Sequence, residues 1–149
     1  MSDIERLRAW LKTFPGASSL EGMQVDFTDQ IPGNFGIFPS GMQEISKTEF
    51  IDGEVILNNQ YNFALYTVFS KAPGDDAGAL LNADWVMDFQ KWVQSQSTTG
   101  AAPKFGNVDQ DEETIKAQNG TLYDADAEGL AMYMVQLTAS FHYHYDWEE

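Results

Sequence analysis

Cysteine is absent from the 149 residues of this sequence. Disulfide bonds, thiolate zinc sites, iron–sulfur clusters and cysteine nucleophiles are therefore excluded, because each of them needs a thiol. The G-x-S-x-G, Walker A, dinucleotide-binding glycine and H-E-x-x-H motifs are absent as well. We therefore predict no enzymatic activity, no catalytic residues and no cofactor.

Basic side chains are scarce. Eight Lys and Arg stand against 23 Asp and Glu, which gives a formal net charge of −15. A surface of this charge repels phosphate groups, so we predict no sequence-specific binding to nucleic acid.

Long apolar runs are also missing, since no window reaches the roughly 18 apolar residues that a membrane span needs. Charged residues interrupt the first apolar stretch, so no secretory signal is expected there. These patterns predict a protein that is made in the cytoplasm and does not contact membranes. With 43% hydrophobic residues, the chain has enough apolar mass for one packed domain over 1–149.

Two stretches have helical periodicity. Ser2 and Glu5 form a capping-box pair, and the apolar spacing that follows predicts an amphipathic helix over 3–13. The second stretch, 76–95, is predicted to be the main helix and to cover the sheet. Its buried stripe is expected to consist of Leu81, Trp85, Phe89 and Trp92.

Alternation of apolar and polar residues predicts the strands. They are expected over 23–27, 43–51, 54–70, 112–123 and 129–145. Asp52-Gly53 predicts a two-residue hairpin turn. The segment 30–41 holds two Pro and three Gly, so we expect only a short strand or a packed loop there, and 96–108 is expected to be a loop. The predicted fold class is α+β, an antiparallel sheet of about four to five strands with an N-terminal helix and one main helix packed on it.

The histidines near the C-terminus resemble a metal site without completing one. His142, His144 and Asp146 share one face of a strand, but a closed zinc site needs more ligands, and the same face is otherwise polar. His142 and Asp146 also match the bare HxxxD of chloramphenicol-type acyltransferases, although Trp147 stands where that motif continues with glycine. We interpret these histidines as part of the polar, solvent-facing side of the strand, and predict no metal there.

The segment Asp124 to Gly129 imitates the first half of an EF-hand loop, with carboxylates at positions 1, 3 and 5. Position 12, which supplies a bidentate Glu in EF-hands, is Val135. We therefore predict an acidic hairpin turn that does not bind calcium.

Charge is distributed unevenly along the chain. Seven acids lie between Asp109 and Glu128 against the single Lys116, whereas the predicted helix 3–13 holds three of the eight basic residues, Arg6, Arg8 and Lys12. Both segments are open to two interpretations. They are either solvated surfaces, or they pair with each other between neighbouring copies of the chain.

The order of these segments resembles a known family. SDIERLRAWLKTFP, YNFALYTVFSK, DWVMDFQKWVQSQ and GTLYDADAEGLAMYMVQLTASFHYHY follow one another along the chain. Together they are similar to small proteins encoded in the tail-morphogenesis clusters of Gram-positive siphophages and prophages. These proteins are described as minor capsid or tail-terminator-like proteins, and the resemblance extends from Ser2 to Tyr145.

The resemblance implies a virion protein at the head–tail joint. An α+β protomer would self-associate, with a hexamer as the expected ring, on the end of the tail tube, and would contact the tail tube and head–tail connector proteins. No functional residue carries over, because such a ring has no active site. Acidic side chains facing the lumen would let DNA pass without binding it.

Two other classes of function stay open at this point. A small acidic immunity protein or antitoxin that binds a basic partner protein would have the same size and charge. A hydrolase or transferase is the third class. Assembly into a closed ring would separate the virion protein from the immunity protein or antitoxin, and a ligand-binding screen with His142 and His144 replaced would test for the enzyme.

Overall fold

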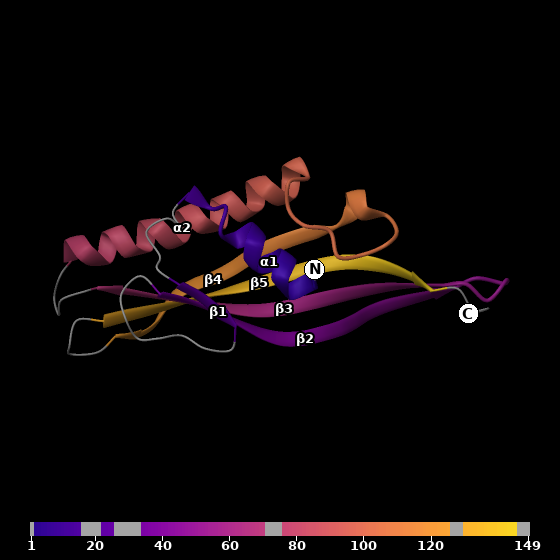
Figure 1. The fold of residues 1–149 in the computed structure, drawn as a ribbon, viewed down its shortest axis with the longest axis horizontal. Coiled ribbons are helices and arrows are strands. Elements are labelled where there is room, and N and C mark those ends of the chain that lie inside the picture. Colours follow the sequence, from indigo (N-terminus) through magenta and orange to yellow (C-terminus); the bar gives the residue numbers. More distant parts are fainter. Residues whose placement is uncertain (1, 16–21, 26–33, 71–75, 126–129, 146–149) are drawn as a thin grey trace.

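The structure is a computed structural model that describes residues 2–15, 22–25, 34–70, 76–125 and 130–145. Figure 1 shows a long sheet with both helices, α1 (Asp3–Leu11) and α2 (Asp76–Thr99), on one of its faces. At the end of the molecule where β2 meets β3, the strands continue past the helices (Figure 1). The predicted α+β class, with an N-terminal helix and a main helix on the sheet, is confirmed.

The sheet has five strands in the order β1-β2-β3-β5-β4. They are β1 (Gly22–Val25), β2 (Asn34–Glu49), β3 (Val55–Ser70), β4 (Thr114–Ala125) and β5 (Leu130–Tyr145). The last four pair antiparallel, as expected, whereas β1 pairs parallel to β2 over four residues. The predicted strand over 112–123 begins later, because the 3-10 helix η2 (Gln110–Glu112) precedes it.

The prediction of a short strand or packed loop over 30–41 was wrong for its described part. Residues 34–41 belong to β2, which continues without a break to Glu49. Pro39 has no N–H for a ladder, and among the described residues β1 pairs with β2 only as far as Ile37. Proline is tolerated at sheet edges and beside bulges. An irregularity in the pairing follows between Pro39 and Met42, where Gly41 has a φ of +86°.

The hairpin predicted at Asp52-Gly53 is present, but its loop has three residues instead of two. The Phe50 N–H donates to the Glu54 carbonyl at 2.9 Å, and the Gly53 N–H donates to the Phe50 carbonyl at 3.0 Å. Gly53 has a φ of +90°, which only glycine adopts without strain. A type I turn closed by such a glycine is the common three-residue hairpin loop.

Helix α1 begins at the predicted cap, since the Ser2 side chain accepts a hydrogen bond from the Glu5 N–H, and ends at Leu11. Helix α2 extends to Thr99, so the first residues of the expected loop 96–108 are helical. The stripe that α2 buries differs from the prediction. Its most buried residues are Asn82, Val86, Phe89 and Val93.

The tryptophans of α2 lie beside that stripe and contact α1 and the residues just after it. Trp92 stacks on Trp10 with ring centroids 4.8 Å apart, and Trp85 meets Phe14 edge-on at 5.4 Å. Both α2 tryptophans are partly buried instead of fully buried, so the prediction is only partly right for them, and the Leu81 side chain lies outside the described residues. The aromatic contacts join the two helices above the sheet.

Candidate functional site

The two histidines lie on the face of the sheet opposite the helices, each half-buried. His144 Nε2 lies 3.4 Å from a carboxylate oxygen of Glu54 on the neighbouring strand. Asp146, which belongs to both the candidate metal group and the HxxxD pattern, lies outside the described residues.

His142 instead lies beside two carboxylates that the sequence pattern did not associate with it. One donor atom each from Asp109, Glu112 and His142 fall within 4.8 Å of one another. Both carboxylates are exposed, and exposed acidic groups commonly approach one another without an ion. The absence of a metal site therefore stays a prediction. Nothing local in the sequence indicates this cluster, because His142 lies 30 residues after Glu112.

A well-bonded loop brings Asp109 and Glu112 to β5. The buried carboxylate of Glu113 accepts hydrogen bonds from the Phe105 N–H at 2.7 Å and the Gly106 N–H at 3.0 Å. Asn107 bonds through its side chain to the N–H and the carbonyl of His144. A Cβ on Gly106 would lie 2.1 Å from the His142 carbonyl oxygen, so only glycine allows this close approach.

The EF-hand-like segment divides between two strands. Asp124 belongs to β4, and Val135, at the position of the bidentate Glu, is buried in β5. The residues between, 126–129, lie outside the described part of the chain. A valine side chain offers no oxygen ligand, and the absence of a calcium site here stays a prediction.

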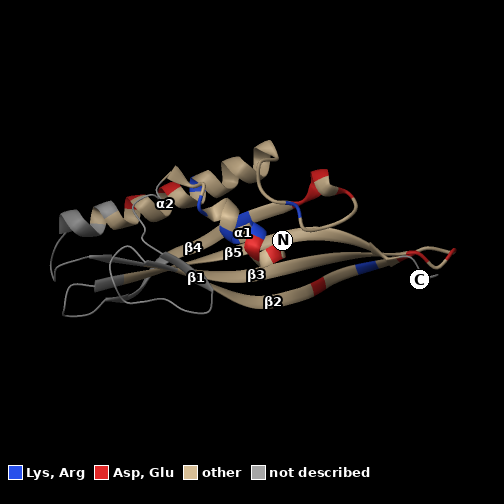
Figure 2. Ribbon diagram, viewed as in Figure 1, with Lys and Arg blue, Asp and Glu red and all other residues tan. Residues whose placement is uncertain are grey.

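The acidic run from Asp109 to Glu128 does not form one surface within the described residues. Asp109, Asp111 and Glu112 are exposed together around η2, whereas Glu113 is buried inside the loop. Figure 2 shows a second gathering of acids at the β2–β3 hairpin. That hairpin carries Glu49, Asp52 and Glu54.

The basic residues of α1 are not equivalent. Arg6 pairs with Asp3, donates to the Lys104 carbonyl at 2.7 Å, and lies over the Phe105 ring at 5.5 Å. The interpretation of all three basic residues as a solvated outer face is therefore wrong for Arg6, which holds α1 against the loop. Arg8 and Lys12 have no such contact among those the structure describes, and Lys12 is exposed.

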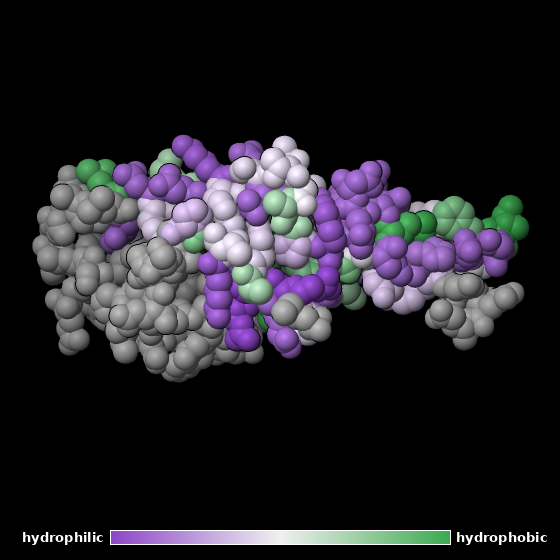
Figure 3. Space-filling view, turned by 45° about the horizontal axis from the view of Figure 1, so that its top comes forward, coloured by the Kyte–Doolittle hydropathy of each residue, from purple (hydrophilic) through white to green (hydrophobic). Residues whose placement is uncertain are grey.

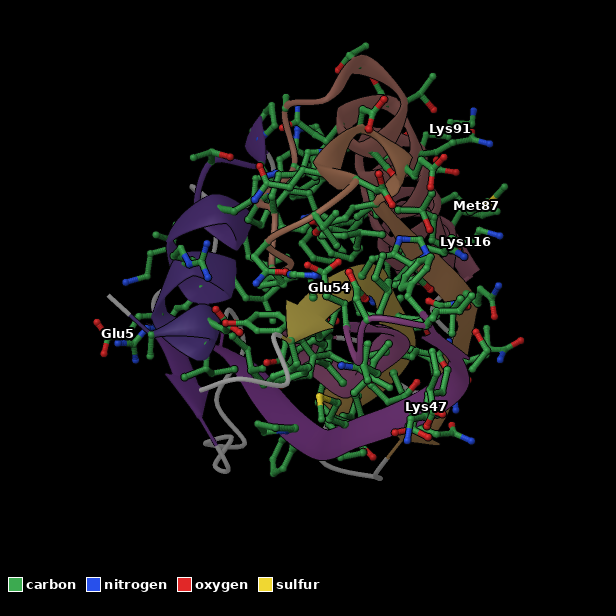
Figure 4. All side chains as sticks on the ribbon, turned by 90° about the vertical axis from the view of Figure 1, so that its right-hand side faces the viewer. Glu5, Lys47, Glu54, Met87, Lys91 and Lys116 are labelled. Atoms are coloured by element: carbon green, nitrogen blue, oxygen red, sulfur yellow. The ribbon has the colours of Figure 1, made fainter. Side chains whose placement is uncertain are left out.

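A polar groove of about 440 Å³ lies between α2 and β4. Lys91 from α2 and Lys116 from β4 lie on the same side of the molecule (Figure 4). The described residues that line the groove include no carboxylate or imidazole, so the general acids and bases that enzymes most often use are missing there.

Exposed apolar side chains gather at the β2–β3 hairpin. Ile51 in the turn is fully exposed, and Phe50 is 46% exposed. Figure 3 shows hydrophobic atoms at this end of the molecule, away from the helices. Sequence analysis missed these residues as a site, although two large apolar residues immediately before a turn are a usable signal of an exposed patch.

No protein-family model and no curated protein matches this chain. No helix of the described residues is long and apolar enough to cross a membrane.

Proposed function

We propose that this protein is a structural component of a bacteriophage virion, a tail terminator or head–tail joining protein that assembles into a ring on the end of the tail tube. The observation that carries the proposal is the β2–β3 hairpin. It extends past the helices and ends in exposed Phe50 and Ile51 on a strongly acidic molecule (Figure 3). Exposed apolar patches of this kind mark protein interaction surfaces.

Two further points support the proposal. The resemblance of four segments to siphophage and prophage tail proteins extends over nearly the whole chain. The net charge of −15 suits a ring that conducts DNA better than one that binds it, because acids facing a lumen repel phosphates. The protein would have no catalytic turnover.

The ring would use heterologous contacts, in which one patch of a protomer meets a different patch of the next. The basic residues of α1 are the positive side of such a contact, since α1 and the residue after it hold three of the eight basic residues. An acidic patch of the neighbouring copy is the negative side.

The decisive experiment measures the mass of the protein by light scattering at micromolar concentration, alone and mixed with the tail tube protein of a phage that carries the gene. We expect a closed oligomer that binds the tube. In a phage that carries the gene, its deletion should give tails of abnormal length that do not join heads. Normal tails joined to heads would overturn the proposal, and a monomer that binds only a basic partner protein would favour an immunity protein or antitoxin.

A further inference from the structure

The β2–β3 hairpin has an apolar counterpart elsewhere on the molecule. A cavity of about 220 Å³ lies between the first turn of α1 and the irregularity in β2. It is lined by Asp3, Ile4, Pro39, Gly41, Tyr61 and Phe63. Its volume exceeds the roughly 150 Å³ of an apolar cavity that holds benzene, so it has room for one large apolar side chain.

The cavity has a rigid wall. The Tyr61 hydroxyl donates a hydrogen bond of 2.7 Å to Asp3, which fixes the ring between α1 and β3. The Tyr61 ring also packs on Phe63 and Phe141, with centroids 6.0 and 4.7 Å away. At Gly41, which also lines the cavity, an added Cβ would meet nothing within 4 Å.

The hairpin of the same chain cannot reach this cavity. From Val55 to Tyr61 the strand advances six residues, or about 20 Å at about 3.3 Å per residue. Each of these residues is also paired with β5, so the hairpin cannot fold back. An apolar projection and an apolar cavity that cannot meet within one molecule can meet between two.

The charges beside the two surfaces are complementary. Glu49 and Asp52 are exposed at the hairpin, where Glu49 pairs with Lys47 at 2.8 Å and Asp52 is left as an acid in the turn. Arg8 and Lys12 lie on and just after α1, the helix that forms one wall of the cavity, and Asp3 in that wall pairs with Arg6. Docking the hairpin there would place acids of one copy near bases of the next.

We infer that the occupant of the cavity is Ile51 or Phe50 of a second copy of this chain, so that the hairpin of each protomer docks between α1 and β2 of the next. This inference rests on the proposed self-association and specifies its contact. The contact is heterologous, as a closed ring requires, because projection and cavity are different surfaces. In this contact the negative side of the interface is formed by the acids of the hairpin and not by those around η2.

The cysteine-free sequence makes the contact directly testable by crosslinking. Ile51→Cys and Pro39→Cys are made as separate proteins and mixed under mild oxidation, since both positions are exposed. We expect a disulfide-linked heterodimer in the mixture, because a side chain seated in the cavity brings the two backbones within disulfide reach. Lys91→Cys on α2, which is also exposed, is the control and should not crosslink with either variant.

A second measurement does not depend on disulfide geometry. Ile51→Asp should weaken assembly about tenfold or more, because the side chain that anchors the contact becomes charged. Met87→Asp introduces the same charge at an apolar residue of α2 that is 56% exposed, and should assemble like the parent.

The results of these experiments distinguish a failure of the docking contact from a failure of the proposed function. If the parent assembles, yet the mixture does not crosslink or Ile51→Cys alone crosslinks as well as the mixture, the docking of hairpin in cavity is wrong and the proposed ring stands. If the parent stays a monomer at all concentrations, with and without the tail tube protein, both are wrong.

Discussion

At the scale of single residues, Tyr61 links the N-terminal helix to the sheet. Its hydroxyl donates to Asp3, and its ring packs on Phe141. Burial, followed by the hydrogen bond to Asp3, raises the pKa of Tyr61 to about 12. The neutral phenol is thus the form that the folded protein favours.

The first prediction concerns stability at high pH. Because the pKa of Tyr61 is higher in the folded than in the unfolded chain, its contribution is complete below the unfolded pKa of about 10 and is lost as the pH rises through about 12. Urea unfolding of the parent and of Tyr61→Phe between pH 8 and pH 12 measures this. The parent should lose more stability than the variant above about pH 10, and parallel losses would contradict the assignment.

The second prediction concerns the aromatic residues of α2. Phe89 is 1% exposed, whereas Trp85 is only partly buried. Phe89→Ala should therefore cost about 3–5 kcal/mol of the free energy of unfolding, and Trp85→Ala less, because a partly exposed ring leaves a smaller cavity. Denaturant unfolding of both variants gives the comparison. A larger loss of stability for Trp85→Ala than for Phe89→Ala would mean that Trp85, and not Phe89, lies at the centre of the buried stripe of α2.

At the scale of elements, α2 covers an edge of the sheet as well as a face. β4 is the outer strand, and two of its backbone groups bond to helix side chains. The Ile115 N–H donates to the Ser97 hydroxyl at 3.0 Å, and the Ala117 carbonyl accepts from Gln90 at 3.1 Å. Side chains that satisfy edge groups keep another strand from adding there.

The third prediction follows from these two bonds. Gln90→Ala and Ser97→Ala should each destabilise the protein by about 0.5–1.5 kcal/mol, the usual net contribution of one hydrogen bond. Gln94→Ala is the control, because that side chain is exposed on the same helix and makes no hydrogen bond to the β4 backbone among the contacts that the structure describes. Equal effects of all three substitutions would show that the loss comes from the helix and not from the edge.

Element by element, the sequence predicts most of the fold where a local pattern suffices. The capped α1, the glycine turn at Asp52-Gly53 and the alternation in β3 each lie within one segment. The first part of β2, residues 34–41, was missed because Pro39 signals the end of a strand unless it lies at a sheet edge or beside a bulge. The pairing of β1 and the irregularity after Pro39 are tertiary information.

The candidate sites could be predicted less well, for the same reason. Asp109 meets His142 only because Val108 bridges to β5, and the cavity beside Tyr61 exists only where α1 crosses β2. No spacing within a segment encodes either contact. The exposure of Ile51, in contrast, was predictable, because an isoleucine in a hairpin turn lies too far from the core to pack into it.

At the scale of the whole molecule, positive charge is the scarce component of any contact between copies. Arg6 is engaged within the chain, so exchanging it would disturb the fold as well as the surface. Arg8 and Lys12 remain as the bases through which electrostatic assembly is best tested.

The fourth prediction is that Arg8→Glu combined with Lys12→Glu impairs assembly at low salt and leaves the monomer folded, because exposed ion pairs contribute little to stability. Lys91→Glu combined with Lys116→Glu makes the same change of charge on α2 and β4, on the side of the molecule away from α1, and should assemble normally (Figure 4). Sedimentation at two salt concentrations and circular dichroism measure the two effects. Unimpaired assembly of the first pair would rule out charge pairing through α1.

The strand order also constrains when the protein can fold as it is synthesised. β5 lies between β3 and β4, and pairs with β3 along all sixteen residues, joining Val55 to Tyr145. Until β5 leaves the ribosome, the β2–β3 hairpin has an unpaired inner edge and α2 has no complete sheet to cover. Such an edge is a site of aggregation. Nascent chains that stall before Leu130 are thus the form of this protein most in need of a chaperone.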